Sequence, residues 1–81
     1  MVTWQYRTIS IRYDKKTHKN WFVEIEGQPP LVGMQAILDA YGSEGWELVS
    51  LSADEQRAYP NFGRWEIVAE VYTATFKRPV A

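Results

Sequence analysis

The feature that most constrains this chain is a junction in residues 38–49 (LDAYGSEGWELV), where a helical pattern gives way to a strand pattern. Before Gly42 the apolar residues recur at helical spacing, whereas the residues from Trp46 onward alternate as in a strand. Glycine readily adopts the left-handed conformation found just past the end of a helix. We therefore expect Gly42 to end the helix and Trp46 to pack beside Leu38 and Tyr41.

The apolar positions before the junction predict a helix that begins at about Pro30 or Leu31. A proline in the first turn of a helix costs no hydrogen bond. One face of this helix gathers the apolar side chains of Leu31, Met34, Leu38 and Tyr41, flanked by Ile37. Gln35 and Asp39 are expected to face water.

Four further segments have the β-branched and aromatic composition of strands, namely residues 3–13, 21–26, 46–53 and 64–77. Polar residues, glycines and prolines predict loops at 14–20, 27–30 and 54–63, and Arg78 with Pro79 is expected to close the domain. The sequence predicts an α+β fold in the order ββαββ, a four-stranded, mainly antiparallel sheet with one helix packed on one face. At 81 residues we expect a single domain, 1–81.

The first of these strands changes the phase of its alternation. Trp4 and Tyr6 share one face, whereas Ile9 and Ile11 share the other. Either both faces are partly covered or a bulge near residues 7–8 resets the register. The chain also has twelve aromatic residues (four Trp, five Tyr and three Phe), more than a small core readily hides. We therefore expect a homodimer in which some of them are buried against a second copy.

Composition excludes several classes of function. Nine basic and ten acidic residues give a net charge of −1, which disfavours a dedicated nucleic-acid binder. The chain has no cysteine, and its single histidine, His18, lies among lysines that would disfavour a metal ion. We expect no metal site and no cofactor. The sequence shows no apolar run long enough for a membrane span and no signal peptide, so we expect a cytoplasmic protein with no membrane contact.

Three short motifs resemble a family of small uncharacterised prokaryotic domains. They are W-x-Y at residues 4–6, G-x-x-G-W-E-L-V at 42–49 and F-K-R-P at 76–79. The resemblance covers 4–13 and 31–79, and residues 14–30 look like an insertion. Because this family of unknown function has no established activity, the resemblance implies a fold and carries over no functional residue.

One segment has the composition of a binding surface. Tyr59, Phe62, Arg64 and Trp65 are aromatic and basic residues close together in the chain, and Lys77 and Arg78 would extend such a patch. Aromatics interleaved with arginines hold a peptide, a small molecule or single-stranded nucleic acid on a sheet. The competing interpretation is a loop whose aromatics fold back on the sheet edge.

No nucleotide-binding, nucleophile or metal-ligand motif is present, which disfavours an enzyme. Glu66 and Glu70 share a strand face, as do Glu24 and Glu26, and a solvated sheet surface accounts for both pairs. The leading expectation is a small noncatalytic binding or assembly module that self-associates through its sheet. The alternative is a small-ligand pocket protein, or a minor enzyme, that uses a sheet carboxylate; single-stranded nucleic-acid binding comes third.

Overall fold

The computed structural model describes residues 1–61 and 63–80, without the side chains of residues 55–57, 59, 61 and 65–69. Its elements are, in chain order, β1 (Thr3–Asp14), β2 (Asn20–Val23), β3 (Leu31–Val32), α1 (Met34–Ser43), β4 (Glu47–Asn61) and β5 (Arg64–Val80). The strands form one antiparallel sheet in the order β3-β2-β1-β5-β4. The predicted α+β class is confirmed, with five strands in place of four and the chain order βββαββ.

The additional strand, β3, replaces the predicted first turn of the helix. Leu31 pairs with Val23 and Val32 with Phe22, and the N–H of Gly33 donates to the carbonyl oxygen of Trp21 at 2.7 Å. Gly33 has φ 97°, a conformation that L side chains rarely adopt. The helix therefore begins at Met34, and the prediction of Pro30 or Leu31 is wrong because strand pairing takes these residues first.

The predicted loop at 54–63 is also wrong, because β4 continues to Asn61 and β5 starts at Arg64. Backbone pairing runs to the tip, where Gly63 has φ 80° in the turn. Two of the prolines that suggested a break in the chain lie where a strand lacks a neighbour on one side. Pro60 lies on β4, an edge strand, and Pro79 lies beyond the last β4–β5 pair, which joins Glu47 and Lys77. A missing N–H is tolerated at such positions.

The first strand contains no bulge between residues 3 and 12, where its pairing with β5 is continuous. Odd-numbered residues such as Ile9 and Ile11 therefore face α1, the helix side of the sheet. Even-numbered residues lie on the other side, the open face. Trp4 and Tyr6 lie there, 40% and 63% exposed. Of the two alternatives, the bulge is thus excluded, and the change of phase reflects a strand with apolar residues on both faces.

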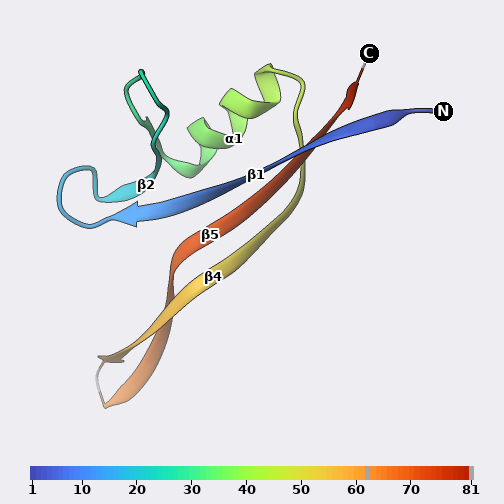
Figure 1. Ribbon diagram of the computed structural model, residues 1–81. Coiled ribbons are helices and arrows are strands. Elements are labelled where there is room, and N and C mark those ends of the chain that lie inside the picture. Colours follow the sequence, from blue (N-terminus) through green and yellow to red (C-terminus); the bar gives the residue numbers. More distant parts are fainter. Residues whose placement is uncertain (62, 81) are drawn as a thin grey trace.

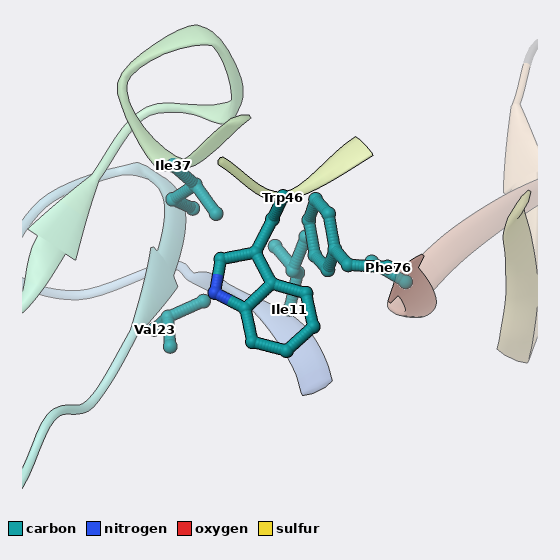
Figure 2. Packing of buried hydrophobic residues seen from close by; sticks show 6 residues of the cluster. Ile11, Val23, Ile37, Trp46 and Phe76 are labelled. Carbon is teal, nitrogen blue, oxygen red and sulfur yellow. The ribbon is translucent and has the colours of Figure 1, made fainter. Parts of the chain in front are cut away.

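A small core lies between α1 and the helix side of the sheet. Its buried residues are Ile11, Val23, Ile37, Trp46, Ala74 and Phe76, most of them labelled in Figure 2. Half-buried side chains on the expected helix face, Leu31, Met34, Leu38 and Tyr41, pack against this cluster. Tyr41 stacks on Phe76 with ring centroids 4.8 Å apart. Gln35 and Asp39 are exposed, as predicted.

The junction keeps its predicted role but uses the second glycine. Gly42 lies within α1, and Gly45 takes the positive φ of 88°. The N–H of Gly45 donates to the carbonyl oxygen of Gly42, and the N–H of Trp46 donates to that of Tyr41. These two bonds form the Schellman motif, in which a residue just past the helix packs on its last turn. Trp46 is buried as expected, at 5% exposure.

Glycine is therefore expected to be needed at position 45 and not at 42. Gly45→Ala should lower the free energy of unfolding by about 1–2 kcal/mol, because alanine resists the left-handed conformation. At Gly42 an added Cβ meets nothing within 4 Å. Gly42→Ala should be neutral or stabilise the helix by up to about 1 kcal/mol. Urea denaturation measures both, and equal destabilisation would contradict the cap assignment.

Trp46 is expected to be essential for folding. Trp46→Ala removes a large buried side chain and should cost about 3–5 kcal/mol, comparable to the whole stability of a domain this small. The matched control is Gln35→Ala on the outer face of α1, which loses one exposed hydrogen bond to Asp39 and should be nearly neutral. Thermal melts followed by circular dichroism test both variants. A folded Trp46→Ala protein would show that the core is held elsewhere.

Candidate interaction surface

The four predicted binding residues lie at the tip of the β4–β5 hairpin. Backbone pairing places Pro60 opposite Trp65 and Asn61 opposite Arg64. Arg64 is exposed, Phe62 lies outside the described residues, and the side chains of Tyr59 and Trp65 are not described. The prediction that these four residues form a binding surface therefore stays a prediction.

Lys77 and Arg78 do not extend that patch, because they lie near the opposite end of β5 from Arg64. Fourteen residues of strand span about 45 Å. The Lys77 ammonium lies 4.3 Å from the centroid of the Trp4 ring on the open face. Lys77 and Arg78 therefore lie at the end of the sheet where β5 pairs with the start of β1, far from the tip of the hairpin.

Arg78 has a structural role at the junction. Its guanidinium lies 4.2 Å from the Trp46 ring centroid, and its Nη1 donates to the carbonyl oxygen of Glu44, just past α1. Its Nε donates to Oε1 of Gln5. The Arg7 guanidinium also lies over the Trp46 ring, at 5.2 Å. These two cations shield the ring from water and tie the end of the helix to β1 and β5.

An open hollow of about 630 Å³ lies beside the 14–18 loop and contains Glu70, one of the predicted carboxylates. Lys15 Nζ lies 2.8 Å from Glu70 Oε1. Asp14 accepts hydrogen bonds from the backbone N–H groups of Thr17, Lys16 and His18, and those from Thr17 and Lys16 chiefly hold its pKa below the ordinary value. Asp14 and Glu70 thus hold the loop, and Glu24, a further acidic residue that lines the hollow, is exposed.

Within the described part of the chain, no group of three histidine, cysteine or acidic residues is placed to hold a metal ion. Among the same residues, no helix is both long and apolar enough to cross a membrane. His18 is exposed and lies 6.4 Å from Phe22, measured between ring centroids.

The β4–β5 hairpin projects beyond the rest of the sheet. Strand β1 pairs with β5 only over residues 71–80, whereas β4 pairs with β5 from residue 64 to residue 77. Figure 1 shows α1 above β1 and β2, with the hairpin extending away from the helix. The hairpin therefore extends past the end of β1 and away from α1, which still contacts β4.

A bulge near the start of β4 arranges the apolar residues of this strand. Leu48 pairs with Phe76 and Ser50 with Thr75, so Val49 is an extra residue. Leu51 then pairs with Ala74. Because Phe76 and Ala74 both belong to the core on the helix side, Leu48 and Leu51 share that side as well. We call Leu48, Val49 and Leu51 the edge patch; they are 38%, 51% and 38% exposed.

Sequence reasoning did not single out the edge patch. In an uninterrupted strand, residues three apart point to opposite faces. The spacing of Leu48 and Leu51 therefore hid their common face, and no turn residue marks the bulge between them. A run of apolar residues after Trp46 was the only available signal.

No family model, no curated protein and no solved structure matches this chain. The resemblance carried by residues 4–6, 42–49 and 76–79 stays a prediction.

We expect Asp14 to contribute to the stability of the protein by holding the 14–18 loop, and we expect His18 to contribute nothing measurable. Asp14→Ala removes the acceptor of three backbone N–H groups and should lower the melting midpoint, whereas His18→Ala should leave it nearly unchanged. Because the folded-state pKa of Asp14 is lowered, its stabilisation is complete above the ordinary carboxyl pKa of 3.8 and is lost as the pH falls through the lower folded value.

The two variants should be melted between pH 2 and pH 7. The difference between wild type and Asp14→Ala should be constant above about pH 5 and should shrink in acid. A large loss in His18→Ala with none in Asp14→Ala would reverse the assignment.

Proposed function

We propose that this protein is a small noncatalytic binding or assembly module that self-associates through its sheet. The observation that carries the proposal is the amount of surface a single chain exposes. The accessible surface is 6145 Å², whereas a folded monomer of 9.4 kDa exposes about 5,000 Å². The excess of about 1,100 Å² exceeds the roughly 800 Å² that each partner buries in a standard interface.

The shape of the chain supports the same proposal. Its radius of gyration is 15.3 Å, against about 12 Å expected for a compact domain of this length. The principal extents are 55 × 29 × 17 Å. A two-stranded ribbon is marginally stable by itself in water. The projecting hairpin therefore gains most from a second surface against which to pack.

The alternatives have less support. A pocket protein that uses a sheet carboxylate would rely on Glu70, which faces Lys15 at 2.8 Å in an open hollow. Binding of single-stranded nucleic acid would need a basic surface. The chain has a net charge of −1, and Arg64 is far along β5 from Lys77 and Arg78. Self-association as a homodimer is the leading function.

The oligomeric state tests this proposal directly. Size-exclusion chromatography with light scattering, at micromolar concentration, should report about twice the 9.4 kDa mass of the chain. The midpoint of thermal unfolding should also rise with protein concentration, because association stabilises the folded state by mass action. A strict monomer at high concentration, with a midpoint independent of concentration, would contradict the proposal.

A further inference from the structure

We infer that a second copy of this chain docks on the helix side of the β4–β5 hairpin, with the edge patch (Leu48, Val49 and Leu51) at the centre of the contact. This inference rests on the proposed self-association and adds its location and geometry. The two copies pack face against face around a two-fold axis, so that each edge patch meets that of the other copy. Such an isologous contact closes after two subunits.

The first argument is the apolar surface that the edge patch continues. Next along β4, Ala53 is exposed and pairs with Tyr72, which is half-buried. Tyr72 packs edge-on against Trp21, with ring centroids 5.0 Å apart, and Trp21 packs likewise against Tyr13 at 5.3 Å. Apolar and aromatic side chains thus continue across the helix side from β4 to β2, where Trp21 and Tyr72 also pack against the core. An interface core has this composition.

The second argument is that the open face is polar opposite the edge patch. Ser50 pairs with Thr75, which pairs in turn with Thr8, and the next row contains Ser52, Thr73 and Ser10. Thr73 Oγ1 donates to Asp54 Oδ2 at 3.0 Å. Hydroxyl groups in regular rows interact well with water and offer little apolar area. At this position along β4, burial of the helix side therefore removes more apolar surface from water than burial of the open face would.

The third argument is that the outer edge of β4 is poorly suited to pairing with another strand. Irregularities follow Leu48 and Ala53, and only residues 50–53 lie between them in regular register. Pro60, nearer the tip, has no N–H to donate. Bulges and prolines are features by which proteins protect exposed edges. A face-to-face contact uses the apolar side chains of β4 and does not need unpaired backbone N–H and C=O groups along its outer edge.

The available area matches what a stable dimer needs. Each chain exposes about 1,100 Å² more than a compact monomer of its mass, and a standard interface takes roughly 800 Å² from each partner. The hairpin projects from the compact body beyond the end of β1, and the edge patch lies at its base, where β5 also pairs with β1. A second copy seated on the edge patch, and extending from there along the helix side of the hairpin, would therefore cover surface that a single copy leaves open.

Substitutions on the two faces of the sheet test the location. Leu51→Glu places a charge in the proposed interface and should weaken the dimer roughly tenfold or more. The control is Tyr6→Glu on the open face, where the side chain is 63% exposed, and it should leave the dimer intact. Sedimentation over a concentration series measures both. Dissociation by Tyr6→Glu with no effect of Leu51→Glu would overturn the inference while leaving self-association in place.

A crosslinking experiment keeps the test valid if Leu51→Glu fails to fold. The chain has no cysteine, so single substitutions can be crosslinked selectively with a short bis-maleimide. Leu51→Cys should give a covalent dimer at least ten times faster than Ser52→Cys, whose side chain lies on the open face one residue away. Equal rates would indicate pairing at the β4 edge, and faster reaction of Ser52→Cys would indicate the open face. Either result would overturn the inference, whereas a monomeric wild type would overturn the proposed function itself.

Discussion

The rest of the structure depends on the burial of Trp46 at the point where the helix ends and the sheet resumes. The backbone N–H of Trp46 donates to the carbonyl oxygen of Tyr41, which fixes how the chain leaves α1. The indole then packs in the core beside Ile37 and Phe76, as Figure 2 shows. One residue therefore joins the cap of the helix, the start of β4 and the core. The cationic groups of Arg7 and Arg78 complete the cover over its ring.

Helix α1 is too short to cover the sheet against which Trp46 packs it. Ten helical residues extend about 15 Å, whereas the 17 residues of β5 extend about 55 Å. Because α1 lies over β1 and β2, the far half of the β4–β5 hairpin has no helix above it. A chain with a small core and a long ribbon exposes more surface than its mass requires. That mismatch of lengths is the physical basis for the proposed self-association.

The sequence predicted the parts of this fold that depend on local pattern. The apolar face of the helix, the long first strand and the burial of Trp46 follow from spacing and composition. The errors concern choices that tertiary pairing decides. By sequence, either Gly42 or Gly45 could be the glycine that ends the helix. Only the hydrogen bonds of the folded chain show that it is Gly45. The polar residues after Ala53 resemble a loop, yet pairing with β5 extends them into a strand.

The candidate surface was beyond prediction for a related reason. Two leucines three residues apart point to opposite faces unless an extra residue intervenes, and Val49 is that residue. The same bulge interrupts the outer edge of β4, which hinders the addition of another strand. One irregularity therefore does two things: it gathers apolar side chains on the helix side and it makes the edge unsuitable for open-ended assembly. A strand of this kind favours a closed pair of chains over a growing sheet, which agrees with the form of self-association proposed above.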